Sequence, residues 1–290
     1  MTPVETSQPE RPICVICGRQ ADDFCALDGA QYRICGGCGL VFQHPLPTRG
    51  AMVAWADNEY ASGAYRDYVQ SRPMKIRHFE DRLADVGPGV RPGRLLDVGC
   101  SCGYFMEVAA AHGFDVHGVE FSQNAIAVAR PDIRARIFEG SLENLPDTGP
   151  FDVVSAFDLI EHVPDPRAFL RNCAKRLRPG GMLLVSTPDT GHFLRYVMRS
   201  RWPMLQPMQH LHLFSRQAMA QALRSEGFVE VRVETAYKTL SMEYLINQIR
   251  SLNPVLSKML GTMSRAAPRS VLQRYRRVNI GEILAVARRV

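Results

Sequence analysis

The fold of this 290-residue chain is decided by one stretch, Arg94-Leu-Leu-Asp97-Val-Gly99-Cys-Ser101-Cys-Gly103-Tyr104. A short apolar run of strand length ends there in a glycine-rich turn, and a helical pattern follows the turn. Glycine lets the backbone approach a bound ligand at a distance that any Cβ would block. A nicotinamide-binding motif needs G-x-G-x-x-G after the strand. Ser101 and Tyr104 take its second and third glycine positions, so that motif is excluded.

An acidic residue is expected at the end of the next strand, where it would accept hydrogen bonds from both hydroxyls of a ribose. Glu120 has this position, in His117-Gly-Val-Glu120-Phe121. A carboxylate suits the role because it only accepts hydrogen bonds and can take two donors. The turn alone also fits a coincidental glycine-rich loop. The strand, the turn and Glu120 together predict a nucleoside site.

From residue 94 onward, apolar runs alternate with helical stretches. We expect strands at 94–99, 115–120, 135–139, 151–157 and 181–187, and helices at 103–112, 122–130, 141–145 and 166–177. This alternation predicts an α/β fold with a doubly wound parallel sheet. Two further apolar runs, 228–234 and 282–288, would complete the sheet, and a segment of helical character, 238–277, separates them.

The spacing Asp97-x-Gly99-x-Ser101-x-Gly103 resembles the D-x-G-x-G-x-G turn of class I S-adenosylmethionine-dependent methyltransferases. The segments 151–166 and 177–188 resemble the fourth strand with its loop and the entry to the fifth strand of that family, and 202–215 resembles a later block of many bacterial members. The resemblance covers about residues 94–235. It implies a Rossmann-like sheet of seven strands, the last one antiparallel. Ser101 replaces the usual middle glycine, and its small size should preserve binding.

The same resemblance implies which residues bind S-adenosylmethionine. They are Asp97, Gly99, Ser101, Gly103, Glu120, Phe121, Ser141, Leu142, Glu143, Phe157 and Asp158. Many members place an acidic residue near the adenine amine. Here that contact is assigned to Ser141, Glu143 or a backbone group.

Methyl transfer from a sulfonium is an in-line displacement, so positioning lowers its barrier. A hydroxyl nucleophile also benefits from a general base of near-neutral pKa, for which histidine is suited. His162 follows the fourth strand at the edge where ligands bind in such sheets, and His210 and His212 lie in the later block. These three are the candidate catalytic residues, although each also fits a structural role. Asp158 and Glu161 are lesser candidates.

Four cysteines near the N-terminus form two Cys-x-x-Cys pairs, Cys14/Cys17 and Cys35/Cys38, with 17 residues between the pairs. This spacing predicts a tetrahedral Zn²⁺ site, which would be structural because four thiolates leave no open position. Two disulfides or free thiols are the alternative, and a reducing cytoplasm disfavours disulfides. The adjoining stretch 40–48 resembles zinc-ribbon methyltransferases among bacterial cell-surface polysaccharide and natural-product enzymes.

The expected organisation is a disordered tail (1–12), a zinc-binding module (13–48), a helical linker or lid (49–93) and a methyltransferase domain (94–290) with a helical insertion (238–277). The polar N-terminus lacks the apolar core of a secretory signal. No apolar run approaches the ~20 residues of a membrane-spanning helix. A cytoplasmic location is therefore expected.

The net charge of +6 is concentrated at one end of the chain. Residues 236–290 hold ten Lys/Arg and two Asp/Glu, a balance of +8, whereas residues 1–50 hold four Arg and five Asp/Glu, a balance of −1. The basic segment 238–277 suits a phosphate-bearing acceptor or a peripheral membrane contact, and it also fits a solvated surface. A zinc module that reads RNA should be basic, so a nucleic-acid partner is disfavoured.

The leading functional hypothesis is a methyltransferase for a small molecule. Its acceptor would be a hydroxyl or carbon of a sugar, sugar nucleotide or secondary metabolite. A ribosomal RNA methyltransferase with a zinc module is the first alternative, and a non-catalytic protein that retains the fold is the second. A fold does not identify the acceptor, and these residues do not determine the oligomeric state.

Overall fold

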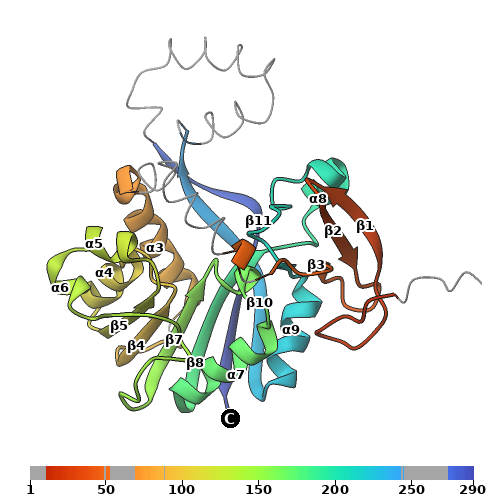
Figure 1. The fold of residues 1–290 in the computed structure, drawn as a ribbon. Helices are drawn as coiled ribbons and strands as arrows, with labels where there is room; N and C mark the ends of the chain where they lie inside the picture. Colours follow the sequence, from red (N-terminus) through yellow and green to blue (C-terminus); the bar gives the residue numbers. More distant parts are fainter. Residues whose placement is uncertain (1–10, 49, 53–68, 88, 243, 245–273) are drawn as a thin grey trace, which may run out of the picture.

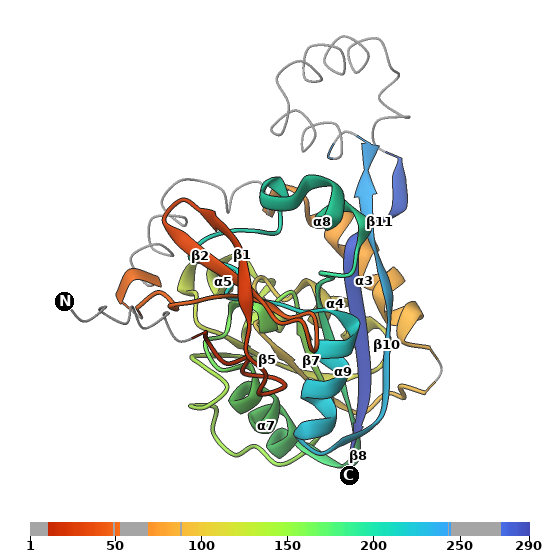
Figure 2. The ribbon, with the colours of Figure 1, turned by 90° about the vertical axis from the view of Figure 1, so that its right-hand side faces the viewer.

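A computed structural model describes residues 11–48, 50–52, 69–87, 89–242, 244 and 274–290. A seven-stranded sheet with helices on both faces forms the body of the molecule, and a smaller sheet lies beside it (Figure 1). Two strands of the large sheet, β10 (Phe228–Ser241) and β11 (Tyr275–Arg289), extend beyond the others and form a two-stranded arm, as both views show (Figures 1 and 2).

The large sheet has the strand order β10-β11-β8-β7-β4-β5-β6. Its strands are β4 (Arg94–Val98), β5 (Asp115–Glu120), β6 (Ile137–Glu139), β7 (Phe151–Phe157), β8 (Leu177–Pro188), β10 (Phe228–Ser241) and β11 (Tyr275–Arg289). Strands β6, β5, β4, β7 and β8 pair in parallel, and β11 pairs antiparallel with both β8 and β10. This confirms the expected Rossmann-like sheet of seven strands with an antiparallel last strand.

The central strands are buried on both faces because helices cover each side. Leu95 of β4 belongs to one apolar cluster and its neighbour Leu96 to another, as expected when successive side chains point to opposite faces. The cluster around Leu95 includes Phe105 and Val86, whereas the cluster around Leu96 includes Leu170. Continuous apolar runs, rather than alternating ones, are typical of such parallel sheets.

The helices are α3 (Arg72–Val86), α4 (Tyr104–Ala111), α5 (Gln123–Val128), α6 (Pro131–Arg134), η1 (Ile160–His162), α7 (Pro166–Arg176), α8 (Phe193–Met198), η2 (Arg199–Arg201) and α9 (Arg216–Ser225). Side-chain caps begin three of them: Ser122, Asp165 and Ser215 each accept a hydrogen bond from the amide three residues onward. None of the helices among the described residues is long and apolar enough to cross a bilayer.

Some expected elements differ from those observed. Residues 141–145 form a turn instead of a helix, and the expected helix 122–130 is shorter, with α6 as a second short helix after it. Strands β10 and β11 extend into both ends of the expected helical insertion 238–277, because residues 238–241 pair with 275–278. The central part of that insertion (245–273), much of the expected linker (53–68) and most of the tail (1–10) lie outside the described residues.

The small sheet joins the N-terminal cysteine module (residues 13–48) to the later part of the chain. Its order is β1-β2-β3-β9, with β1 (Asp22–Leu27), β2 (Ala30–Ile34), β3 (Val41–Gln43) and β9 (His212–Leu213). In the sequence, strand β9 comes after β8 of the large sheet. In the structure it pairs with β3 of the cysteine module, where Val41 lies opposite Leu213 and Phe42 opposite His212. The cysteine module therefore shares a sheet with the block that contains two of the candidate histidines.

A buried ionic network links α3 to β10 and β11. Arg82 and Glu282 form an ion pair in which their side chains are 1% and 3% exposed, and the Lys238 ammonium lies 2.9 Å from the other oxygen of Glu282. The Nε and Nη1 atoms of Arg82 have no hydrogen-bond partner among the described residues. Glu282 therefore compensates the charge of the buried Arg82, and it shares that of the partly buried Lys238 with Asp158.

We predict that Glu282→Gln lowers the free energy of unfolding by about 3–5 kcal/mol, since loss of one partner leaves a buried charge uncompensated. Urea denaturation measures the change. Glu230→Gln is the matched control because Glu230 pairs with Arg288 on the surface with 68% of its side chain exposed, and it should change stability by about 1 kcal/mol or less. Equal effects of the two substitutions would contradict the importance of the buried network.

Candidate functional site

The glycine-rich turn between β4 and α4 has left-handed backbone at three positions. Gly99, Ser101 and Gly103 have φ angles of 71°, 49° and 73°. A Cβ on Gly99 would lie 3.0 Å from Leu159, and one on Gly103 would lie 2.5 Å from Ile133. Serine at a positive φ is uncommon, so Ser101 holds a conformation that the surrounding structure must stabilise.

Glu120 supplies that stabilisation from the end of β5. One carboxylate oxygen accepts a 2.9 Å hydrogen bond from the Ser101 amide, and the other accepts a 2.9 Å bond from the Ser122 amide. Burial raises the pKa of Glu120, although these amides act in the opposite direction. Each oxygen of a carboxylate can accept two hydrogen bonds, so Glu120 retains capacity for a further donor.

Asp97 lies beneath the turn rather than in an open site. Its side chain is buried and accepts a 2.7 Å hydrogen bond from the Ser155 hydroxyl of β7. Burial raises the pKa of Asp97 to about 7, against the effect of that hydroxyl. Its contacts link β4 to β7, so its role in the structure is to hold the strand from which the turn begins.

The other candidates for cofactor binding differ in their surroundings. Phe121 is 64% exposed directly after Glu120, whereas Leu142 is buried. Ser141 is exposed, and the Glu143 carboxylate accepts a 3.2 Å bond from Asn172 of α7.

Phe157, at the end of β7, packs edge-on against Phe105 at 4.8 Å. Leu159, two residues further on, contacts Gly99 closely. The carboxyl ends of β4, β5 and β7 thus meet at one edge of the sheet, as ligand sites in such folds require.

Asp158 sits at this edge in a left-handed conformation, with φ 51°. The Lys238 ammonium lies 2.5 Å from its carboxylate, and the Ser186 hydroxyl donates to it at 3.1 Å. Burial acts to raise the pKa of Asp158, but the positive charges of Lys238, Arg82 and Lys75 outweigh it and lower the pKa below its usual range. Asp158 is therefore ionised and bound to a cation.

Sequence reasoning missed the cations of this network. Lys238 comes from β10 and Arg82 from α3, at positions that carry no motif. Burial and the nearby ammonium of Lys238 lower the pKa of a third cation, Lys75, to about 8. Only the folded chain brings these residues to Asp158, and no local pattern could have identified them.

His162 and His210 face each other near the same loop, with ring centroids 5.0 Å apart. Nδ1 of His162 lies 2.8 Å from the Gln209 carbonyl, and Nδ1 of His210 lies 2.7 Å from the Met204 carbonyl. A carbonyl accepts only, so each Nδ1 carries the proton and each Nε2 is left as an acceptor. Burial lowers the pKa of His162 and lowers that of His210 to about 3.

His212 has a different environment. It is 3% exposed and stacks on Phe42 of the cysteine module at 6.5 Å, and its Nδ1 lies 3.1 Å from the Val163 carbonyl. Burial lowers the pKa of His212 to about 4. These contacts place it in the packing between the module and the loop after β7.

Glu161 is the third member of a cluster with His162 and His210. Burial and the charge of Asp158 raise the pKa of Glu161 to about 8, and the Thr187 hydroxyl donates to its carboxyl group at 2.9 Å. One side-chain nitrogen or oxygen each from Glu161, His162 and His210 lies within 4.8 Å of the others. Of the three groups, Glu161 has its pKa near neutrality, whereas burial keeps both imidazoles neutral at pH 7.

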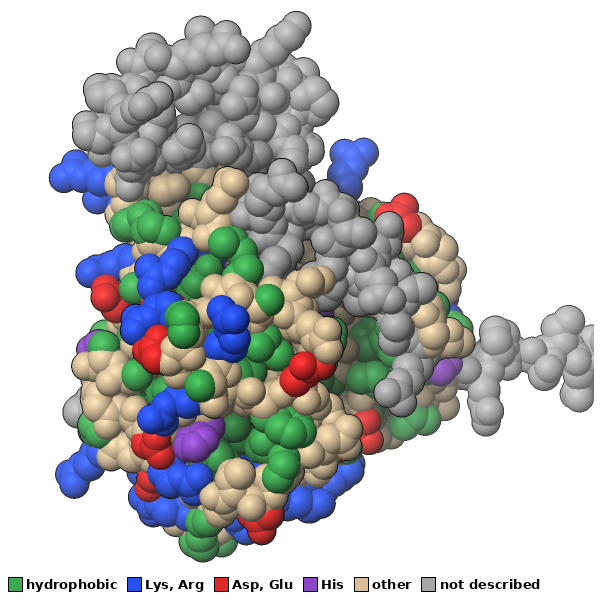
Figure 3. Space-filling view, turned by 60° about the vertical axis from the view of Figure 1, so that its left-hand side comes forward, with side chains coloured by type: hydrophobic (Ala, Val, Ile, Leu, Met, Phe, Trp, Pro, Cys, Tyr) green, Lys and Arg blue, Asp and Glu red, His purple; other side chains and the backbone are tan. Residues whose placement is uncertain are grey.

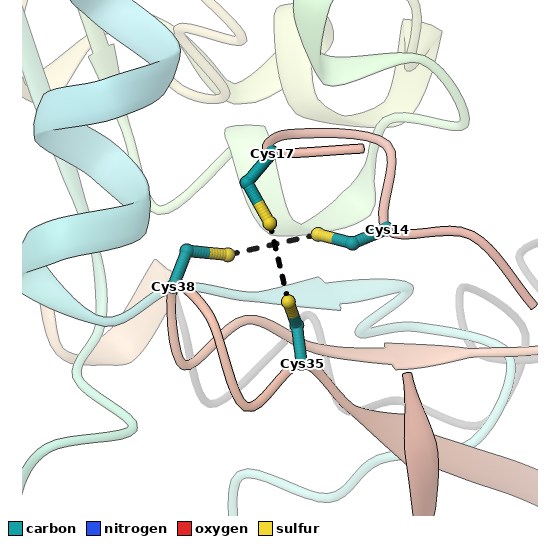
Figure 4. A group of neighbouring side chains, drawn as sticks. All are labelled: Cys14, Cys17, Cys35 and Cys38. Carbon is teal, nitrogen blue, oxygen red and sulfur yellow. Dashed lines mark hydrogen bonds between the residues drawn. The ribbon is translucent and has the colours of Figure 1, made fainter. Parts of the chain in front are cut away.

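The four cysteine thiols of the module point toward a common centre (Figure 4). Their sulfur atoms lie within 4.8 Å of one another, with Cys14–Cys38 at 3.6 Å and Cys17–Cys35 at 3.2 Å. These distances exceed a disulfide bond of about 2.0 Å and approach the separation of about 3.8 Å expected around tetrahedral zinc. The hydrogen bond with Cys38 lowers the pKa of Cys14 to about 5 and raises that of Cys38. The donor set and its geometry fit a zinc ion.

Comparison with known proteins places these features in a family. A family model described as a methyltransferase domain matches residues 65–233, more than half of the chain. Ubiquinone biosynthesis O-methyltransferase of Pseudomonas aeruginosa (strain UCBPP-PA14) is 30% identical over 142 residues, 46% of this chain and 57% of that protein. The enzyme of the same name from Coxiella burnetii (strain Dugway 5J108-111) is 35% identical over 121 residues, 40% and 50%. The chain thus spans about half the length of the curated relatives it matches.

Two solved structures share the fold at low identity. A SAM-dependent methyltransferase from Thermotoga maritima has a TM-score of 0.53 and 19% identity, and the match covers 81% of this chain and all of that one. The 1,6-didemethyltoxoflavin-N1-methyltransferase of Burkholderia thailandensis has a TM-score of 0.50 and 17% identity, over 93% and 100%. With the matched family model, the turn and Glu120, this establishes that the chain belongs to the class I S-adenosylmethionine-dependent methyltransferase domain family.

Proposed function

We propose that this chain transfers a methyl group from S-adenosylmethionine to a hydroxyl of a small-molecule acceptor. The proposal rests on one observation, the meeting of the glycine-rich turn with Glu120 and with Leu159 of the His162 loop at the carboxyl edge of the sheet. The relatives from P. aeruginosa and C. burnetii are named as O-methyltransferases, which supports an oxygen acceptor. A carbon of a sugar or secondary metabolite is the next acceptor to test.

The cofactor would lie along the edge formed by β4 and β5. Glu120 would accept the ribose hydroxyls with its remaining acceptor positions, and the turn at Gly99–Gly103 would face the methionine part. Phe121 is exposed beside Glu120 and would stack on the adenine. S-adenosylmethionine supplies an electrophilic methyl group when bound.

His162 is the best-placed general base of the three candidate histidines. Its Nδ1 proton is held by the Gln209 carbonyl, so Nε2 can accept the proton of an acceptor hydroxyl. The lowered pKa keeps His162 neutral at pH 7. His162 is partly exposed, whereas His210 and His212 are buried, so His210 would support its neighbour and His212 would serve packing.

An RNA acceptor has less support. The cysteine module carries no excess of positive charge, since residues 1–50 hold four Arg and five Asp/Glu. On the face of the molecule in Figure 3, cationic and anionic side chains of the described residues are interspersed. RNA-binding surfaces need clustered cations.

A phosphate-bearing acceptor or a membrane contact through 238–277 stays a prediction, because most of that segment lies outside the described residues. Within the described part, Nη2 of Arg277 donates to both carboxylate oxygens of Asp85, at 2.6 and 2.7 Å. The exposed Arg277 guanidinium is therefore engaged with α3, and Arg274 and Arg276 are the other exposed cations among the described residues of this segment.

We further propose that the cysteine module binds one structural zinc ion. Four converging thiols with no bond between them support this site, and a reducing compartment such as the cytoplasm would keep them available. The proposed division of the chain treats residues 13–48 as this module and residues 94–290 as the methyltransferase domain.

We predict that Glu120→Ala weakens S-adenosylmethionine binding by about 1.5–3 kcal/mol, because the ribose hydroxyls lose a charged acceptor. Isothermal titration calorimetry measures the change. Glu139→Ala is the matched control: Glu139 ends β6 directly beside Glu120, but its side chain is exposed. Unchanged affinity in Glu120→Ala would remove this residue from the site.

We predict that purified protein contains about one zinc ion per chain and that Cys35→Ser loses it, since three thiolates hold the ion more weakly than four. Elemental analysis gives the zinc content. Cys25→Ser, a change at a cysteine of β1 outside the cluster, should retain the metal. A fully folded wild-type protein without zinc would refute the metal site.

The function itself is tested by a screen with methyl-labelled S-adenosylmethionine against phenols, sugars, sugar nucleotides and ribosomal RNA. We expect transfer to a small hydroxyl compound. With that acceptor, His162→Asn should lower kcat by about 10²–10⁴-fold, because Asn retains an amide donor for the Gln209 carbonyl but cannot take the proton. Wild-type activity should fall on acidification through the lowered pKa of His162.

His117→Asn is the histidine control for this assay, since His117 lies next to Asp115 within β5, away from the His162 loop. Transfer to RNA alone would favour the first alternative function. Cofactor binding without transfer to any acceptor would favour a non-catalytic protein.

A further inference from the structure

Strand β3 of the cysteine module contains a buried polar residue that packing alone does not require. Val41, Phe42 and Gln43 are all buried, and Gln43 is 2% exposed. A buried amide is unfavourable unless its hydrogen bonds are made, so an apolar side chain would satisfy a packing role at lower cost. The presence of glutamine here points to a specific hydrogen-bonding role.

The side-chain amide of Gln43 donates hydrogen bonds to groups on either side of β3. Its Nε2 donates to the His210 carbonyl at 3.0 Å and to the Tyr32 hydroxyl at 3.3 Å. Its backbone amide donates to the Leu211 carbonyl at 3.0 Å. One residue of the module therefore binds two successive carbonyls of the segment 209–213.

On its other side, segment 209–213 is hydrogen-bonded to the loop that contains His162. The Leu211 amide donates to the Glu161 carbonyl at 2.7 Å, and the Gln209 carbonyl accepts from Nδ1 of His162 at 2.8 Å. Segment 209–213 is thus held between β3 and η1, and the bond that fixes the tautomer of His162 depends on its position.

The module is also anchored to the methyltransferase part at its cysteine end. The Ser215 hydroxyl donates to the Cys38 carbonyl, the Thr190 hydroxyl donates to the Gly39 carbonyl at 2.9 Å, and Gln217 donates to the Gly37 carbonyl at 3.0 Å. These contacts fix the Cys35–Cys38 turn, and with it β3, against the segments that contain Thr190 and Ser215. A shift of this turn and β3 would move the 209–213 segment with it.

We propose that Gln43 is a positioning residue for the acceptor side of the site, through which the cysteine module sets the orientation of His162 and His210. This deepens the proposed function and rests on it. The module thereby takes part in the reaction centre without touching cofactor or acceptor. The buried side-chain amide of Gln43 fixes the position of segment 209–213 relative to η1. That segment in turn orients the imidazole of His162 through the Gln209 carbonyl.

The test compares Gln43→Met with wild-type protein. Methionine preserves the unbranched shape and the backbone amide but removes both side-chain donors, so the His210 carbonyl loses a partner. In full-length protein with labelled histidine, we expect altered ring signals and altered pH titration of His162 and His210. His162→Asn and His210→Asn assign the signals. Zinc content and S-adenosylmethionine affinity should match those of wild type.

Gln31→Leu is the matched control, because Gln31 lies on the adjacent strand β2 with an exposed side chain. It should leave the histidine signals unchanged. Once an acceptor is known, Gln43→Met should reduce kcat by about 10–100-fold with an unchanged KM for the cofactor, since small displacements of a catalytic group have effects of this size.

Unchanged histidine signals in folded Gln43→Met protein would overturn the proposal. If Gln43→Met does not fold, Gln43→Asn answers the same question, because its amide stops one methylene short of the His210 carbonyl. The histidine signals are read without turnover, so a failure of this coupling is distinguished from a failure of the proposed methyl transfer.

Discussion

The buried carboxylate of Glu120 accepts hydrogen bonds from the backbone amides of Ser101 and Ser122, and the candidate cofactor site depends on this arrangement. The turn after β4 contains a serine at positive φ, a conformation with a steric cost for any residue with a Cβ. A charged acceptor at the end of the adjacent strand offsets that cost. The residue expected to bind the ribose is therefore also the one that holds the turn in shape before any ligand arrives.

Two long-range contacts then hold the loop after β7 at the same edge. The arm of β10 and β11 carries Lys238 to Asp158, where the ammonium compensates a carboxylate at the end of β7. The cysteine module carries Gln43 to the His210 carbonyl on the other side of the His162 loop. The loop after β7 is thus held by an ionic contact on one side and by a shared sheet on the other.

Burial also sets the chemical state of this loop. His162 and His210 are kept neutral because removal from water disfavours the imidazolium, whereas Glu161 is kept protonated because removal from water disfavours the carboxylate. Asp158 lies close by but stays ionised, since Lys238 supplies an opposite charge. Different partners thus give neighbouring acidic residues opposite protonation states, a pattern typical of acid–base sites.

Local patterns located the parallel strands of the large sheet and the turn, whereas the antiparallel last strand was implied by the resemblance to the methyltransferase family. The apolar runs of β4, β5, β7 and β8 have strand length, and the spacing of Gly99, Ser101 and Gly103 follows from the backbone that a tight turn needs. They did not predict the small elements well: 141–145 is a turn, and residues 238–241 and 275–278 extend strands into a segment expected to be helical. Strand pairing between distant segments overrode local helical preference there.

Asp97, Glu120 and the four cysteines were located from the sequence alone because their positions follow from short-range spacing and strand ends. The long-range partners of the site were not, since Lys238, Arg82 and Gln43 belong to no motif and contact residues up to 200 positions away. Hydrogen bonds and ion pairs between such residues form only after the sheets have assembled. The sequence by itself therefore determined the turn, the strand ends and the cysteine spacing that indicate the candidate sites, and only the tertiary structure decided the charge and orientation of the groups around them.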